Sequence, residues 1–590
     1  MLIDRIEVLN LFIQTGNNNY ELKYKLNYEA MNEIGLSPID GGIIIIYLVG
    51  IIWYGIKKGK QKTSEDYFLA GRNMVWPIVG ISLFAANIGS NTLIGLTSEA
   101  YNTNLAVYNY EWMAAVVLVF FAIFFLPFYL RSKVYTMPEF LERRYDSRSR
   151  YYFSTITIIG NVIIDTASGL YAGNLILKII FPELDSTIII LILAGAAAAY
   201  TIPGGLSSVV HTEVIQALLL FASSMVLTYF CFSEVGGWSG MIEGLDLLQP
   251  QGKGPDEILS LVRPLESEYM PWTGLLFGVP LLGFYFWANN QFMVQRVLSA
   301  KDINHGRWGA IFAGLLKLPV LFFMVIPGVI AIVIFSGMDI SGLNYYMKTE
   351  AGEVLCTDLS DCPNMTYPLL IYSLLPTGLL GIVIAGLLAA MSSSISATLN
   401  SSSTLITMDF VKAIKPEMTS KQLVRTGQIA TLVLVLLAAA WAPQIDRFGS
   451  LFDYLQIILG LIAPPIVAVF VMGLFWKRAN GHGAIAGLAG GFILAIFIIL
   501  SSIFDWVPTL NEIHFLHKAP LLMLAVMFIQ MLVSFMTAPP AEEKVDDMVW
   551  SIKIFRAETK ELEGLHWYKN YRILSILLLI VTAVIVVWFW

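Results

Sequence analysis

Apolar runs about as long as a bilayer is thick recur along this chain from residue 39 to the last residue, Trp590. Each crossing of the hydrocarbon needs roughly 20 residues. Backbone amides in lipid must be satisfied within their own segment, so uninterrupted runs of this length predict helices. They lack the alternating pattern of a membrane β-barrel. At 57% hydrophobic and 13% charged residues, the chain has more apolar surface than a soluble domain can bury. The sequence therefore predicts an all-α membrane protein.

The spacing of the runs predicts about fourteen transmembrane helices. Lysine and arginine gather in alternate loops, and all of these loops fall on one side of the membrane when the count is fourteen. Basic loops face the cytoplasm, so both termini are expected outside, in a plasma or bacterial inner membrane. The expected helices are centred near residues 48, 88, 120, 165, 193, 220, 284, 323, 385, 433, 462, 492, 527 and 580.

Two of these spans are poor continuous helices. The second contains the polar sequence Asn87–Ile88–Gly89–Ser90–Asn91, and the seventh contains Gly278, Pro280 and Gly283. Proline removes a backbone donor and glycine lowers helix propensity, so both spans are expected to break near the middle of the membrane. Interrupted spans at matching positions of two halves are typical of inverted-repeat transporters. Glycine and proline also occur in ordinary membrane helices, which leaves the simpler interpretation open.

The densest polar stretch inside any span is residues 387–404. Within it Ala390, Ser393 and Ser394 stand at i, i+3 and i+4 and share one helix face. Two hydroxyl oxygens, together with carbonyls from a broken partner helix, would give about five hard oxygen ligands, which suit a small cation. The alternative is close helix packing, for which small residues are also enriched.

Ionisable residues inside spans form a second group of candidates, because burying them is costly and they usually mark a pathway or a pair. Glu111 and Lys317 either pair across the bundle or both bind a hydroxylated solute. The others are Asp165, Glu213 and Asp453.

The eleventh span carries Phe452, Gln456 and Leu459 at i, i+4 and i+7. An aromatic ring, an amide and nearby charged groups are what a sugar site needs, although each residue alone also fits an interhelical hydrogen bond or packing contact. Cys356 and Cys362 lie in one polar loop and would pair in an oxidising compartment. No HExxH, P-loop or GxSxG motif occurs, so we expect no enzyme activity and no nucleic-acid partner.

Six separated blocks of sequence carry a resemblance to a known family. With these blocks in order, the chain resembles the solute:sodium symporter family, in particular its sodium–glucose cotransporter branch, from about residue 39 to 480. The blocks are EDYFLAGRNMVWPIVGISLFAANIGS (65–90), VYTMPEFLERRY (134–145), GGLSSVVHTEVIQ (204–216), QFMVQRVLSAKD (291–302), SSSISATLNSSSTLITMDF (392–410), and FDYLQ, APPIVAVF and FWKR within 452–478.

The resemblance implies a LeuT-like fold of two inverted five-helix repeats, at about residues 77–232 and 272–475. One extra helix, 39–58, would precede them, after an outer segment at 1–38. Three helices would follow within 481–590, with a cytoplasmic linker near 538–570.

The resemblance also implies the sites. Sodium would lie between the carbonyls of Ala85, Ile88 and Ala390 and the hydroxyls of Ser393 and Ser394. Sugar contacts would map onto Asn87, Glu111, Lys317 and Gln456, and Thr92 and Phe286 would also belong to the solute site. Phe286 and Trp287 would form the inner floor, and Leu96, Tyr110 and Phe452 the outer lid.

Several positions depart from the family pattern. Phe286 stands where sugar transporters usually have tyrosine, and Thr92 where histidine or glutamine often touches the sugar. A second sodium site would involve Glu213 and Ser396. However, Glu213 replaces the usual aspartate and Ala397 lacks a hydroxyl, so we expect one coupled sodium ion. Asp165 has no counterpart.

The expected function is sodium-coupled symport of a glucose- or galactose-like sugar by alternating access. Two alternatives stay open. One is a sodium/inositol symporter or a symporter of another neutral solute, and the other is a sugar-gated sensor with loose coupling.

Overall fold

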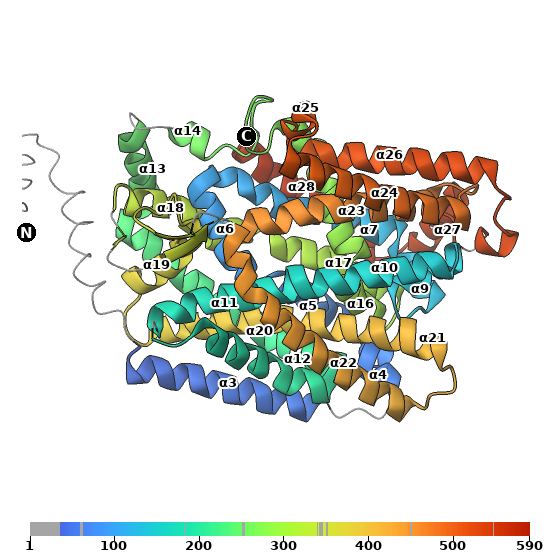
Figure 1. Ribbon diagram of the computed structural model, residues 1–590, viewed down its shortest axis with the longest axis horizontal. Coiled ribbons are helices and arrows are strands. Elements are labelled where there is room, and N and C mark those ends of the chain that lie inside the picture. The colour runs from blue at the N-terminus through green and yellow to red at the C-terminus, as the bar shows by residue number, and fades with distance from the viewer. Residues whose placement is uncertain are drawn as a thin grey trace, which may run out of the picture.

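The computed structural model describes residues 36–590, apart from 60–62, 182, 250–253, 339, 342–345, 350–351, 449–450 and 547. Most of the expected outer segment, 1–38, lies outside the described residues. The described chain forms a bundle whose long helices run roughly along one axis (Figure 1). Its first half contains α3 (Pro38–Lys58), α4 (Ser64–Leu69), α5 (Trp76–Asn87), α6 (Ser90–Thr103), α7 (Asn109–Phe124), α8 (Leu126–Ser132), α9 (Met137–Arg144), α10 (Ser147–Gly160), α11 (Ala167–Ile180), α12 (Ser186–Val235), α13 (Gly237–Leu248) and α14 (Pro255–Ile258).

The second half continues the bundle and adds one short antiparallel hairpin. Its helices are α15 (Trp272–Phe284), α16 (Gln291–Leu298), α17 (Ile303–Lys317), α18 (Ile326–Phe335), α19 (Thr366–Leu374), α20 (Leu379–Leu405), α21 (Lys412–Ile414), α22 (Ser420–Trp441), α23 (Leu451–Phe475), α24 (Gly481–Phe504), α25 (Pro508–Asn511), α26 (Phe515–Met536), α27 (Ile552–Leu562) and α28 (Tyr571–Trp588). The hairpin strands are β1 (Tyr346–Thr349) and β2 (Gly352–Leu355). π-Helical turns occur at η4 (Asn161–Thr166), η6 (Tyr285–Asn289), η7 (Leu321–Val325) and η10 (Ile406–Val411).

Among the described residues, 10 helices are long and apolar enough to cross a membrane, or up to 11 when the bent pair α17 and η7–α18 counts as one span. The all-α membrane class is confirmed, but a count of fourteen is not. The difference arises at interrupted helices. The 50 residues of α12 run through two expected spans, with a break at Gly205, whose φ is 54°. Conversely, α5 alone is too short to cross.

The expected break in the second span is present between α5 and α6. Ile88 ends α5 with φ −89° and ψ 86°, outside the helical range. The seventh span behaves differently from the prediction. Helix α15 continues through Pro280, and the irregular geometry follows it as the π-helical turn η6. Proline inside a span is tolerated where neighbouring groups satisfy the backbone.

Helix α20 lies at the centre of the bundle. In the apolar window of Leu379–Ile414, 89% of the residues are buried, against 22% in α3 and 22% in α28. The polar stretch predicted as an ion-binding face is therefore surrounded by protein, whereas α3 and α28 present most of their apolar surface outward, as helices next to lipid do.

Several helices begin with a polar cap at one end of the bundle. Figure 1 shows α9, α21 and α27 at one end, and α13 and α14 at the other. Near the first end, polar side chains cap helices: their oxygens accept hydrogen bonds from backbone N–H groups of the first turn, which have no partner within the helix. These caps are Thr136, Asp146, Asp302, Thr419 and Asn480. Cys356 and Cys362, which follow the hairpin, form a disulfide.

Candidate functional site

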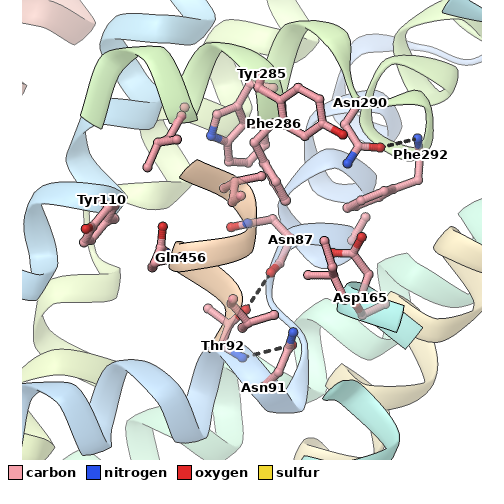
Figure 2. A pocket seen from close by; sticks show the side chains of 18 of the residues that line it. Asn87, Asn91, Thr92, Tyr110, Asp165, Tyr285, Phe286, Asn290, Phe292 and Gln456 are labelled. Atoms are coloured by element: carbon pink, nitrogen blue, oxygen red, sulfur yellow. Dashed lines mark hydrogen bonds between the residues drawn. The ribbon is translucent and has the colours of Figure 1, made fainter. Parts of the chain in front are cut away.

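A cavity of about 150 Å³ lies beside the break between α5 and α6. Its walls come from α5, α6, α7, α10, η4, α15, η6, α16, α17, α20 and α23. The structure brings to this one cavity all six residues predicted to contact the solute, three of the four predicted gate residues and one predicted sodium ligand (Figure 2). They are Asn87, Thr92, Glu111, Phe286, Lys317 and Gln456; Leu96, Tyr110 and Trp287; and Ser394. The side chain of the fourth gate residue, Phe452, lies outside the described part of the chain.

Lys317 organises the polar wall of the cavity. It is the last residue of α17, and its ammonium both pairs with the Glu111 carboxylate and donates to Asn87 Oδ1. Lys317 is 1% exposed and Glu111 6%. A buried charge of this kind is tolerated when it is paired and hydrogen-bonded. Of the two arrangements predicted for Glu111 and Lys317, direct pairing is thus present, and the pair borders the cavity.

Gln456 is on α23 and also lines the cavity. Its Oε1 atom is buried and has no hydrogen-bond partner among the described residues. Leaving such an acceptor unsatisfied costs about 1–3 kcal/mol. A hydroxyl group of a bound molecule would remove that cost.

One wall of the cavity is aromatic. Phe286 and Trp287 belong to η6 and pack edge to face, with ring centroids 5.3 Å apart. Phe292 packs edge to face on Phe286 at 5.5 Å. Lys317 Nζ lies 5.8 Å from the Trp287 ring. Trp287 is buried, whereas Phe286 is only half-buried. This wall offers an apolar surface of the kind that packs against C–H groups.

The break in the second span redirects the backbone hydrogen bonds. In a continuous helix the N–H groups of Gly89 and Thr92 would bond the carbonyls of Ala85 and Ile88. Instead, Gly89 N–H donates to the Asn87 carbonyl at 3.2 Å, and Thr92 N–H donates to the Gly89 carbonyl at 3.1 Å and to Asn91 Oδ1 at 3.0 Å. The carbonyls of Ala85 and Ile88, both predicted sodium ligands, are therefore released from the helical ladder.

The serine face of α20 lies against these released carbonyls. Ser393 Oγ is 3.1 Å from the Ala85 carbonyl oxygen and 2.9 Å from that of Ala390. A Cβ atom placed on Gly89 would lie 3.1 Å from Ser394 Oγ, so Ser394 closely approaches the break. Neutral hydroxyl and carbonyl oxygens are suitable ligands for a hard cation. The described residues contain no cluster of three or more His, Cys, Asp or Glu side chains that could hold a metal ion.

The two residues of the expected second sodium site have other partners. Glu213 pairs with Arg296 and accepts a hydrogen bond from Ser82, and all three are buried. Ser396 Oγ donates to Tyr200 Oη at 2.6 Å and lies 2.5 Å from the Ser392 carbonyl oxygen. Within the described chain, no hydrogen bond joins Glu213 to Ser396.

The cavity also contains polar residues that the sequence did not assign to the sodium or solute site. Asn161 and Asp165 come from η4, and Asn290 follows η6. Asn91 braces the break, with its Nδ2 donating to Ser168 Oγ at 3.1 Å. The polar run Asn289–Asn290–Gln291 directly after an apolar span was a signal that could have identified Asn290.

Known proteins similar to this chain are transporters. The sequence model of the "Sodium:solute symporter family" matches residues 67–491. The sodium/myo-inositol cotransporter 2 of Homo sapiens is 33% identical over 547 residues, which cover 88% of this chain and 80% of that protein. A sodium/glucose cotransporter of Vibrio parahaemolyticus is 37% identical over 479 residues, covering 79% of this chain and 86% of that protein.

A solved structure agrees with these sequence relatives. The substrate-bound, outward-open state of a sodium-coupled sialic acid symporter matches with a TM-score of 0.71 and 22% identity, over 85% of this chain and 99% of that one. This likeness confirms the LeuT-like fold expected from the sequence. The matching family and the sequence relatives are transporters, not enzymes. The chain belongs to the sodium:solute symporter family.

Proposed function

We propose that this protein carries a sugar or a related polyol into the cell together with sodium, by alternating access. The observation that carries the proposal is the shared break between α5 and α6. On one side of it, Asn87 and Thr92 line the cavity. On the other, the released carbonyl of Ala85 meets Ser393 on α20. Sodium binding at these oxygens would order the break and so prepare the neighbouring solute site.

The chemistry of the cavity supports a hydroxylated solute. The ammonium, carboxylate and amide groups of Lys317, Glu111, Asn87 and Gln456 can donate to and accept from hydroxyl groups, and Phe286 provides an apolar face. Relatives named for glucose and for myo-inositol support the same class. We keep sodium–inositol symport as the second candidate within this class.

The distribution of basic residues supports one orientation of the protein in the membrane. We propose that the end with α9, α21 and α27 faces the cytoplasm, because basic residues concentrate in its loops. Both termini would then face outward, as would the Cys356–Cys362 disulfide, which suits an oxidising compartment. The moving parts would be the two repeats, at about residues 77–232 and 272–475. The extra helix 39–58, the three helices within 481–590 and the cytoplasmic linker near 538–570 would lie outside the repeats.

A comparison of initial uptake rates tests the proposed function. Purified protein in liposomes would be offered labelled D-glucose, D-galactose, myo-inositol and lactate, each in sodium and in potassium buffer. We expect sodium-dependent uptake of at least one of the three uncharged solutes, D-glucose, D-galactose and myo-inositol, and no sodium-dependent uptake of lactate. Sodium-dependent uptake of lactate alone would contradict the proposal.

Substituting Gly89 with alanine is expected to weaken sodium activation. The added Cβ would lie 2.4 Å from Asn91 Oδ1 and 3.0 Å from Ser394 Cβ, so the break would have to move away from α20. Overpacking of this kind costs about 1–3 kcal/mol, which corresponds to about fivefold or more in half-saturating sodium. Gly195→Ala is the matched control, because nothing lies within 4 Å of the new methyl group. An unchanged sodium activation curve in Gly89→Ala would count against this placement of the ion.

One sodium ion is expected to enter with each neutral solute molecule. The Glu213 carboxylate is neutralised by Arg296, and Ser396 is bound to Tyr200, so neither group is free for a second ion. Simultaneous measurement of charge movement and labelled solute uptake gives the ratio directly. We expect a value near one elementary charge per solute, and a value near two would show that a second site is in use.

A further inference from the structure

One acidic side chain of the cavity takes no part in the arrangement described so far. Asp165 lies on the π-helical turn η4 between α10 and α11 and lines the cavity. π-Helical turns inside α-helices frequently occur at functional sites. In Figure 2 Asp165 is on the side of Asn87 opposite to Gln456 and Tyr110. It thus contributes to a different wall from Gln456.

The carboxylate of Asp165 is accessible from the cavity. The residue is half-buried, and no hydrogen bond or ion pair joins its side chain to another residue in the described ranges. Its backbone is fixed, because the Asp165 carbonyl accepts a hydrogen bond from Ser168 Oγ at 3.1 Å. A carboxylate inside a membrane protein is expensive and typically faces a binding partner or pathway. Here Asp165 lines the cavity, and Tyr285 of the same lining lies close enough to interact with its charge.

The charge of the cavity wall then restricts what can bind. Its charged lining residues are Glu111, Lys317 and Asp165. Glu111 and Lys317 neutralise each other as an ion pair. Asp165 therefore leaves the wall with one uncompensated negative charge when it is ionised. That wall attracts hydroxyl or amino donors and repels a carboxylate, and like charges brought together at a desolvated surface are strongly unfavourable.

From this arrangement we infer that Asp165 contacts the solute directly and determines whether the site accepts neutral or anionic solutes. Its carboxylate accepts hydrogen bonds from the end of the solute remote from Gln456. The site therefore takes neutral polyols and amino-bearing sugars, and it rejects their carboxylated derivatives. This inference rests on the proposed function, since it concerns the solute of the same cavity.

A competition experiment with matched sugars tests the inference. Uptake of whichever labelled polyol the wild-type protein transports would be competed with D-glucose and with D-glucuronate, which differ by a carboxylate in place of a hydroxymethyl group. For the wild type we expect glucuronate to compete at least about tenfold more weakly than glucose, because the Asp165 carboxylate repels the carboxylate of glucuronate. In Asp165→Asn the ratio of the glucuronate to the glucose inhibition constant should fall severalfold, while glucose itself binds more weakly.

Two further variants separate recognition from structure. Asp165→Glu keeps the charge and should keep most of the difference between glucuronate and glucose as competitors. Asp246→Asn makes the same change on the exposed surface of α13 and should alter neither the glucose nor the glucuronate inhibition constant. A purely structural role for Asp165 would lower stability or maximal rate but leave the ratio of the two competitors unchanged.

The outcomes distinguish this inference from the proposed function. An unchanged glucose-to-glucuronate ratio in Asp165→Asn, with uptake retained, would overturn the role of Asp165 and leave the symporter intact. Wild-type protein that neither transports nor is stabilised against heat by any neutral polyol would overturn both. A narrowed ratio in Asp165→Asn that Asp165→Glu restores would support the inference.

Discussion

Replacing Ser393 with alanine is expected to abolish sodium-dependent uptake at physiological sodium while leaving the protein folded. The Ser393 hydroxyl lies within 3.1 Å of two carbonyl oxygens, those of Ala85 and Ala390, at the point where α5 breaks against α20. Removing one of about five oxygens from such a site costs on the order of 1–3 kcal/mol, or up to about a hundredfold in sodium affinity. The measurement is the sodium dependence of initial uptake rates, extended to high sodium concentrations.

Ser403→Ala provides the matched control. Ser403 is on the same helix, is buried, and donates to the carbonyl three residues earlier, as Ser393 does. It is not among the residues assigned to the ion. The control should keep a normal sodium curve with a similar change in thermal stability. Equal sodium activation in Ser393→Ala and the wild type would remove Ser393 from the ion site.

Neutralising Glu111 and Lys317 together is expected to restore stability but not transport. Lys317→Met leaves the Glu111 carboxylate buried without its partner, which destabilises a protein by about 3–5 kcal/mol. Adding Glu111→Gln removes that uncompensated charge and should return the melting temperature most of the way. Solute affinity should remain at least about tenfold weaker, because a site that bonds hydroxyls loses its substrate when its polar partners change.

Single variants sharpen this prediction. Glu111→Gln alone should yield a folded carrier with weaker solute affinity. Gln456→Ala should give the same defect from another wall, since its Oε1 atom lacks a protein partner in the described structure. Solute affinity and thermal stability would be measured for each variant. Wild-type uptake by the double mutant would mean that Glu111 and Lys317 serve only as a structural pair.

The fold class could be predicted because its determinants are local. Long apolar runs specify helices in lipid, and the sequence Asn87–Ile88–Gly89 marked a break that the structure contains. The number of spans could not be fixed in the same way. Gly205 interrupts α12 without ending it, and Pro280 lies inside a helix that was expected to break there. Whether a helix stops at such residues depends on neighbours distant in sequence.

The site was predictable to the extent that the family resemblance supplied it. Helical spacing alone placed Ala390, Ser393 and Ser394 on one face, but only the fold shows that this face meets the carbonyl of Ala85. The sequence marked Asp165 as an ionisable residue inside a span but did not place it in this cavity. A π-helical turn changes which side chains share a face, and hydrophobic periodicity does not reveal such a turn. The pairing of Glu213 with Arg296 joins residues far apart in the chain and was likewise invisible to local patterns.

The central claim is that a sodium gradient does work on the solute. The most direct test measures concentration rather than rate, in liposomes that contain the purified protein and start with sodium only outside. We expect a labelled sugar or polyol to accumulate inside above its external concentration. An inside-negative potential should increase that accumulation, since each 100 mV contributes about 2.3 kcal/mol per charge. A sodium ionophore should return the solute to its external level. Simple equilibration regardless of the gradient, or a solute-evoked sodium current without accumulation, would contradict coupled symport.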